Sequence, residues 1–162
     1  MLRYEDLRDP VGIRFWPGNK GRDGCRTPMP WEAAAPNAGF TSGAPWLPVS
    51  DDARACAVDR QGHADSVLNR YRHVLAVRKA HPALVDGSIE FVESSENFLA
   101  FVRQSGDQRI LCLFNIGLTE DDWTLPEGIA VSGEALFEKR GATINGNVVA
   151  VPARGSFVAQ LA

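Results

Sequence analysis

The feature that most constrains this chain is the uneven distribution of its prolines. Seven of the ten prolines and three of the four tryptophans fall within residues 1–50, a part that shows no sustained helical or alternating pattern. Proline fixes φ and lacks an N–H, so closely spaced prolines exclude long helices and central strands. Large aromatic side chains seek burial, which argues against disorder. We therefore expect residues 1–50 to form an ordered, irregular segment that packs on another surface.

A regular pattern begins at Asp65 with the sequence DSVLNRYRHVLAVRKAHP. Apolar residues recur there at helical spacing, Asp65 is a suitable N-cap, and Pro82 cannot continue a helix. The spacing predicts one long helix over residues 65–81, with an apolar stripe formed by Val67, Leu68, Tyr71, Val74 and Leu75.

After Gly87 the sequence changes to short β-type segments separated by Gly, Pro or Asn. NFLAFVRQ and QRILCLFNI flank the turn SGD, which is typical of a β-hairpin. Six to eight short strands over about 75 residues favour an antiparallel sandwich or barrel. The fold class is thus α+β and mainly β: an irregular N-terminal region, one long helix, then an antiparallel β-domain at 87–162.

Composition excludes several classes of partner. The net charge is −3, with acids and bases mixed along the chain, so we expect neither nucleic acid nor a membrane surface as a partner. The longest apolar runs are too short to span a bilayer, and the N-terminus lacks a signal-peptide core, which predicts a cytoplasmic protein. The cysteines fit neither a disulfide framework nor a zinc spacing, and Cys112 is expected to be a small buried residue.

Standard catalytic motifs do not occur in the sequence. Phosphate-binding glycine patterns, HExxH and GxSxG are all missing, so we expect no cofactor and no metal. Carboxylates are concentrated in the loop-rich half of the chain, where most charged side chains are simply solvated; they are Glu5, Asp6, Asp9, Asp23, Glu32, Asp51 and Asp52.

The stretch GRDGCRTPMPW at residues 21–31 is the candidate binding loop. Asp23 lies between Arg22 and Arg26, which favours an ion pair that holds a guanidinium in place. Guanidiniums offer fixed forks of donors for hydroxyls, and the indole of Trp31 offers an apolar face. These groups suit a sugar site, and they equally suit a loop that packs well.

Four stretches together resemble one family. They are DPVGIRFWPGNKGRDGCRTPMPW from Asp9, NAGFTSGAPWLPV from Asn37, YRHVLAVRKAHPAL from Tyr71 and VPARGSFVAQLA from Val151. They are similar to the α-glucosidase and oligo-1,6-glucosidase group of the α-amylase superfamily of glycoside hydrolases. That resemblance implies a (β/α)₈ barrel followed by an antiparallel β-sandwich. Residues 1–64 would be the loop after the eighth strand and 65–81 the eighth helix, so that 1–86 belong to the barrel and 87–162 to the C-terminal domain.

The resemblance also implies which functional groups are present. The family's catalytic Asp, Glu and Asp lie on earlier strands, in motifs that this sequence does not contain, so we expect no catalytic residue here and no activity of this chain alone. By motif match, Arg26 or Arg22 would bind the terminal sugar, with Arg26 preferred, and Asp23 and Trp31 would support the site. The implied function is that of the C-terminal part of an α-glucosidase acting on small α-glucoside oligosaccharides.

An alternative is a stand-alone, non-catalytic β-domain that binds carbohydrate or a protein partner. The enzyme-like residues 1–64 favour the interpretation as part of an α-glucosidase, because a free-standing module has no need of them. The helix stripe and the loop tryptophans would leave a sizeable apolar patch, which soluble monomers rarely expose. We expect this patch to be covered by a second copy of the chain or by the missing barrel portion.

Overall fold

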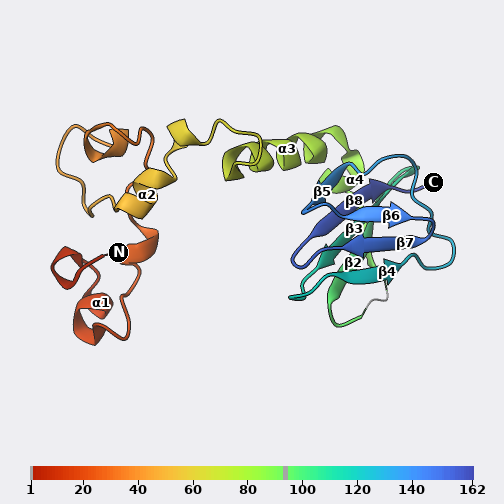
Figure 1. The fold of residues 1–162 in the computed structure, drawn as a ribbon, viewed down its shortest axis with the longest axis horizontal. Helices are drawn as coiled ribbons and strands as arrows, with labels where there is room; N and C mark the ends of the chain where they lie inside the picture. The colour runs from red at the N-terminus through yellow and green to blue at the C-terminus, as the bar shows by residue number, and fades with distance from the viewer. Residues whose placement is uncertain (1, 93–94) are drawn as a thin grey trace. The chain divides into compact units, whose positions relative to one another are not determined.

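The computed structural model describes residues 2–92 and 95–162. The chain divides into two compact units, Met1–Arg72 and His73–Ala162. In Figure 1 the first unit runs from red to yellow-green and the second from green to blue. Each unit is described by itself below.

The first unit contains short helical turns joined by irregular backbone. They are η1 (Tyr4–Asp6), α1 (Pro10–Phe15), η2 (Asp23–Cys25), η3 (Pro36–Gly39), α2 (Asp51–Ala55) and η4 (Val58–Arg60). Pro10 and Pro36 each open such a turn, a position where the missing N–H costs nothing. The prolines therefore start short helices and stop long ones, which confirms the irregular N-terminal region.

The predicted long helix is α3 (Val67–Ala80). Its cap is Ser66 rather than Asp65, because the Ser66 Oγ accepts a hydrogen bond from the Asn69 N–H at 3.1 Å. The Asp65 carboxylate instead pairs with Arg70 at 3.2 Å. The expected Asp65 cap is thus wrong by one residue. Pro82 ends the helix as predicted and opens α4 (Pro82–Val85).

Most of the apolar stripe of α3 is exposed, and Leu68 is half-buried. Four large apolar side chains on the helix lie open to solvent: Val67, Tyr71, Val74 and Leu75.

Among the helices of the described residues, none is both long and apolar enough to cross a bilayer.

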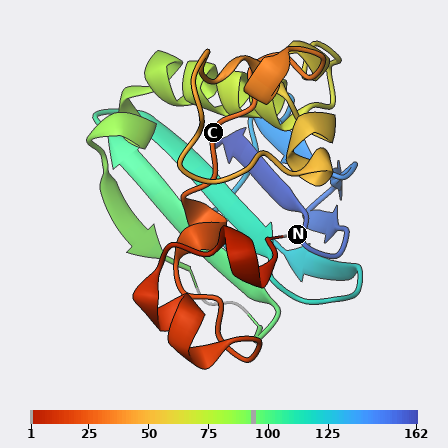
Figure 2. The ribbon, with the colours of Figure 1, turned by 90° about the vertical axis from the view of Figure 1, so that its left-hand side faces the viewer.

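Eight strands follow in the described part of the second unit: β1 (Ser88–Phe91), β2 (Phe98–Ser105), β3 (Gln108–Asn115), β4 (Asp121–Thr124), β5 (Phe137–Lys139), β6 (Thr143–Asn145), β7 (Val148–Val151) and β8 (Ser156–Gln160). They form a five-stranded sheet in the order β1-β2-β3-β8-β5 and a three-stranded sheet in the order β4-β7-β6. Figure 2 shows β1, β2, β3 and β8 side by side. All pairs of neighbouring strands are antiparallel.

The predicted hairpin joins β2 to β3. Ser105 pairs with Gln108, and Gly106 supplies the positive φ of 57° that the two-residue turn requires. Alternate residues of β2 point to opposite faces, so Phe98, Ala100 and Val102 are buried while Leu99 is exposed.

The main core is shared by the two sheets, which makes the domain a sandwich. Trp123, Val149 and Val151 of the smaller sheet belong to one cluster with Leu113 and Phe157 of the larger. On the other face of the larger sheet, Cys112 is buried, and this burial raises the pKa of its thiol to about 11. Cys112 is therefore a small packing residue, as expected.

Candidate functional site

Asp9 caps the first helix of the candidate site. Its Oδ1 accepts a hydrogen bond from the Val11 N–H at 2.9 Å, and Pro10 is the first residue of α1. An Asp cap followed by Pro suits a helix start, because the cap satisfies a free N–H and the proline needs none.

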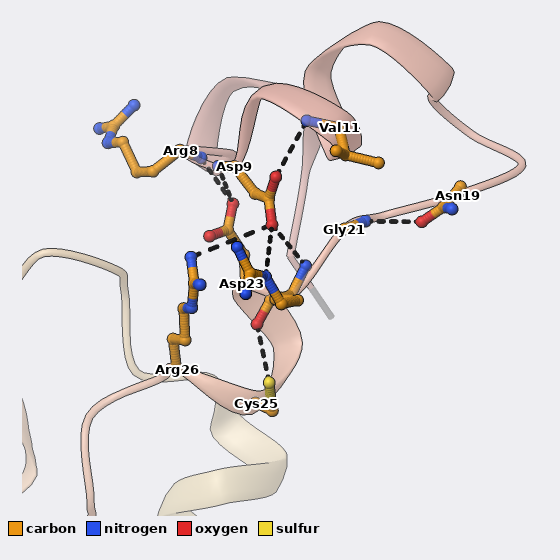
Figure 3. Close-up of polar contacts among 9 residues, drawn as sticks. Arg8, Asp9, Val11, Asn19, Gly21, Asp23, Cys25 and Arg26 are labelled. Atoms are coloured by element: carbon orange, nitrogen blue, oxygen red, sulfur yellow. Dashed lines mark hydrogen bonds and ion pairs between the residues drawn. The ribbon is translucent and has the colours of Figure 1, made fainter.

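The second oxygen of the Asp9 carboxylate meets the candidate loop. Oδ2 accepts a hydrogen bond from the Arg22 N–H at 2.8 Å. The same oxygen lies 3.6 Å from Arg22 Nε and 3.9 Å from Arg26 Nη1. Figure 3 shows the Arg26 guanidinium directed at this carboxylate. The structure thus brings together the two arginines that the sequence singled out.

Asp23 does not form the guanidinium pair that its flanking arginines suggested. Its side chain is fully buried, and its Oδ2 accepts hydrogen bonds from the backbone N–H groups of Arg8 at 2.6 Å and Asp9 at 2.8 Å. Its Oδ1 is buried without a hydrogen-bond partner among the described residues. Asp23 therefore binds backbone N–H groups, and the carboxylate that lies beside the two guanidiniums is that of Asp9.

The two carboxylates form a reciprocal clamp between distant parts of the chain (Figure 3). Asp9 accepts from the backbone of Arg22, and Asp23 accepts from the backbone of Asp9. Gly21 lies between them with φ of +62°, and a Cβ there would come within 2.7 Å of the Asp9 carboxyl carbon. Only glycine allows this approach, so the clamp explains the Gly-Arg-Asp order.

The two guanidiniums remain accessible above the clamp. The side chains are 74% exposed for Arg22 and 43% exposed for Arg26, whereas Asp9 is 4% exposed. At 3.6 and 3.9 Å the ion pairs are too long to be hydrogen bonds. The guanidinium N–H groups can therefore donate to hydroxyl or carboxylate groups of a ligand.

Neither clamp carboxylate is placed for glycoside cleavage. A retaining glycosidase needs a nucleophile and a proton donor that both reach the sugar, about 5 Å apart. Asp23 is fully buried and Asp9 almost so, and both bind backbone N–H groups. The groups that this site leaves open to a ligand are the guanidiniums of Arg22 and Arg26.

Trp31 belongs to a different part of the first unit. Its side chain is half exposed. The backbone N–H of Trp31 donates to the Ala38 carbonyl at 2.8 Å, and the backbone carbonyl of Trp31 accepts from the Asp59 N–H at 3.0 Å. Trp31 therefore joins η3 to η4 through its backbone, away from the Asp9 clamp in the hydrogen-bond network.

One cleft in this unit is not lined by the candidate arginines. Its volume is about 550 Å³, and its polar lining includes Arg3, Lys20, Thr27, Ser50 and Asp51. The ligand-binding expectation for Arg22 and Arg26 therefore depends on the exposed guanidiniums and not on an enclosed cavity.

The hydrogen bonds to Asp9 give a prediction for its titration. The pKa of this carboxyl lies below 3.8 because the Arg22 and Val11 N–H groups and, less strongly, the guanidiniums of Arg22 and Arg26 stabilise its charge. A folded pKa below the unfolded one stabilises the fold fully above about pH 3.8, and this contribution is lost as the pH falls through the folded pKa. A carboxyl ¹³C titration should give a midpoint below 3.8, and a midpoint above it would contradict the clamp.

The sequence contained a signal for Asp9 that the adjacency of Asp23 obscured. An Asp directly before a Pro at the start of a short apolar segment indicates an N-cap, and Asp9-Pro10 fits it. That signal predicts the bond to Val11. It could not predict the contact with Arg22, thirteen residues away.

Comparison with known proteins identifies the family. The family model "Alpha amylase, catalytic domain" matches residues 3–87, which are more than half of the chain. The chain is 47% identical over 165 residues to a probable alpha-glucosidase of Rhizobium meliloti (strain 1021), covering 99% of this chain and 29% of that protein. It is 38% identical over 136 residues to a probable oligo-1,6-glucosidase 2 of Bacillus subtilis (strain 168), covering 83% of this chain and 24% of that protein. The chain therefore spans less than a third of the length of these relatives.

Solved structures show the same likeness along the whole chain. The alpha-glucosyl transfer enzyme XgtA matches with a TM-score of 0.85 and 41% identity, over 100% of this chain and 30% of that one. A MutB mutant in complex with the substrate sucrose matches with a TM-score of 0.78 and 28% identity, over 88% and 26%. Together with the family model, these matches show that the chain belongs to the alpha-amylase family of glycoside hydrolases.

Proposed function

We propose that this chain is the C-terminal part of an α-glucosidase that hydrolyses terminal α-glucosidic bonds of small oligosaccharides. In this proposal residues 1–86 complete a (β/α)₈ barrel and residues 87–162 form its β-sandwich domain. The identity to the Rhizobium meliloti relative over nearly the whole chain supports this assignment.

The observation that carries the proposal is the pair of exposed guanidiniums at Asp9. Arg26 and Arg22 are the residues we propose to bind the terminal glucose, since their exposed guanidinium N–H groups can donate hydrogen bonds to sugar hydroxyls. The chain would supply one wall of the sugar pocket. The catalytic carboxylates would come from the preceding barrel portion, which we also propose to cover the exposed stripe of α3.

A chimera tests the role of the arginines. The segment of the Rhizobium meliloti protein that aligns with this chain is replaced by this chain, and hydrolysis of p-nitrophenyl α-glucoside and isomaltose is measured. Hydrogen bonds to a charged donor contribute about 1.5–3 kcal/mol. Arg26→Ala should therefore lower kcat/KM about 10- to 150-fold.

Arg8→Ala is the matched control for this experiment. Among the residues that the structure describes, its guanidinium donates to the carbonyls of Glu5 and Leu7, and its backbone N–H, which Asp23 binds, is kept. This variant should retain activity within about twofold. If Arg26→Ala behaves like Arg8→Ala while Arg22→Ala loses activity, Arg22 is the sugar-binding residue. If neither substitution lowers kcat/KM, the proposed site is wrong.

A further inference from the structure

We propose that Asp9 is a positioning residue, whose carboxylate charge fixes the directions in which Arg22 and Arg26 present their guanidiniums. This inference rests on the proposed function, because it assigns how the sugar-binding arginines are held. Asp9 lies outside the GRDGCRTPMPW stretch, so its role follows from the fold and not from the motif.

The Asp9 carboxylate is hydrogen-bonded at both of its oxygens. Its Oδ1 is held by the Val11 N–H and its Oδ2 by the Arg22 N–H. The side chain is almost completely buried, and a Cβ on Gly21 would come within 2.7 Å of the carboxyl carbon. Oδ2 is therefore a fixed negative charge at the base of the loop.

The distances from this charge are short enough for electrostatic attraction but too long for a hydrogen-bonded ion pair. Arg22 Nε lies 3.6 Å and Arg26 Nη1 lies 3.9 Å from the same oxygen. Attraction between opposite charges at this separation is appreciable beside a buried group, yet the geometry leaves the N–H donors free of a strong hydrogen bond. A guanidinium that a nearby charge already orients, and whose N–H groups are still available, loses less conformational freedom when it binds a ligand.

Asp23 cannot take this role in the arrangement seen. Its Oδ2 is occupied by the N–H groups of Arg8 and Asp9, and the ion pairs of Arg22 and Arg26 go to Asp9. Asp23 instead fixes the backbone of Asp9 and so places the anchoring charge. The two carboxylates thus have separate tasks: one builds the loop and the other directs its arginines.

Asp9→Asn tests the inference, because it removes the charge and keeps the shape and an N-cap acceptor. In the chimera it should lower kcat/KM about 5- to 50-fold. It should have no further effect, within about twofold, in an Arg22→Ala/Arg26→Ala background, because the residues it directs are gone. Asp6→Asn is the matched control: it removes a carboxylate that pairs with Arg3 at 3.3 Å, and it should leave kcat/KM unchanged.

A second readout does not depend on turnover. In ¹⁵N-labelled chain, the Nε–H groups of Arg22 and Arg26 should become more mobile in Asp9→Asn than in wild type or Asp6→Asn. Protection of the Val11 amide from exchange should persist, which shows that the cap is intact.

The outcomes separate the inference from the proposed function. Loss of activity in Arg26→Ala but not in Asp9→Asn overturns the positioning role and leaves the function standing. Unchanged Nε–H mobility in Asp9→Asn also overturns the positioning role. Increased mobility in Asp9→Asn with full activity in both arginine variants supports the anchoring and rejects the sugar-binding assignment.

Discussion

Replacing Asp23 by alanine is expected to destabilise the first unit by about 2–4 kcal/mol. The substitution leaves the N–H groups of Arg8 and Asp9 without their acceptor in a buried site, and each such group costs about 1–3 kcal/mol. Amide exchange of these two residues measures the effect directly. Because 1.4 kcal/mol is a factor of ten, their exchange should accelerate by about 30- to 700-fold.

Asp52→Ala provides a control for this experiment. Asp52 is exposed in the first turn of α2, so its loss should change stability by less than about 0.5 kcal/mol. Asp23→Asn keeps one oxygen that can accept both bonds and should lie between the two variants. Wild-type exchange rates at Arg8 and Asp9 in Asp23→Ala would show that the clamp does not form.

Replacing Phe157 by alanine is expected to destabilise the β-sandwich by about 3–5 kcal/mol. Phe157 is 2% exposed, pairs with Leu113 across β3 and β8, and belongs to the cluster shared by both sheets. Removing a buried aromatic ring loses its transfer free energy and leaves a cavity. Urea unfolding is monitored by the loss of the β-sheet circular dichroism signal. Its midpoint should fall by the amount that corresponds to this loss of stability.

Leu118→Ala is the matched control, because Leu118 is a large apolar residue exposed outside the strands. The urea midpoint of this variant should differ from that of the wild type by no more than corresponds to about 0.5 kcal/mol in the free energy of unfolding. Equal midpoints for Phe157→Ala and Leu118→Ala would mean that the two sheets do not share a packed core.

The sequence predicted those parts of the fold that local signals specify. The stripe from Val67 to Leu75 and the stop at Pro82 gave the helix, and the turn at Gly106 gave the hairpin. The cap was misplaced because Asp65 and Ser66 are both good capping residues, and only the contact with Asn69 decides between them. The choice between sandwich and barrel depends on how distant strands pair, which short apolar segments do not specify.

The sequence singled out Arg22 and Arg26 but not Asp9, the carboxylate that lies beside both. Arg22 and Arg26 stood out because they flank Asp23, and adjacency in sequence suggested an ion pair within the loop. In the fold, a chain reversal between Asp9 and Arg22 puts Asp9 beside both guanidiniums and turns Asp23 toward the backbone. Such a contact between distant residues has no local signature.

We propose that this chain binds sugar within an α-glucosidase whose catalytic carboxylates come from other residues of that enzyme. The most direct test is hydrolysis of p-nitrophenyl α-glucoside by the purified chain, next to the chimera with the Rhizobium meliloti relative. We expect no turnover by the chain and turnover by the chimera that falls on Arg26→Ala. Turnover by the chain alone that Arg26→Ala abolishes would contradict the claim, because the catalytic groups would then lie within these 162 residues.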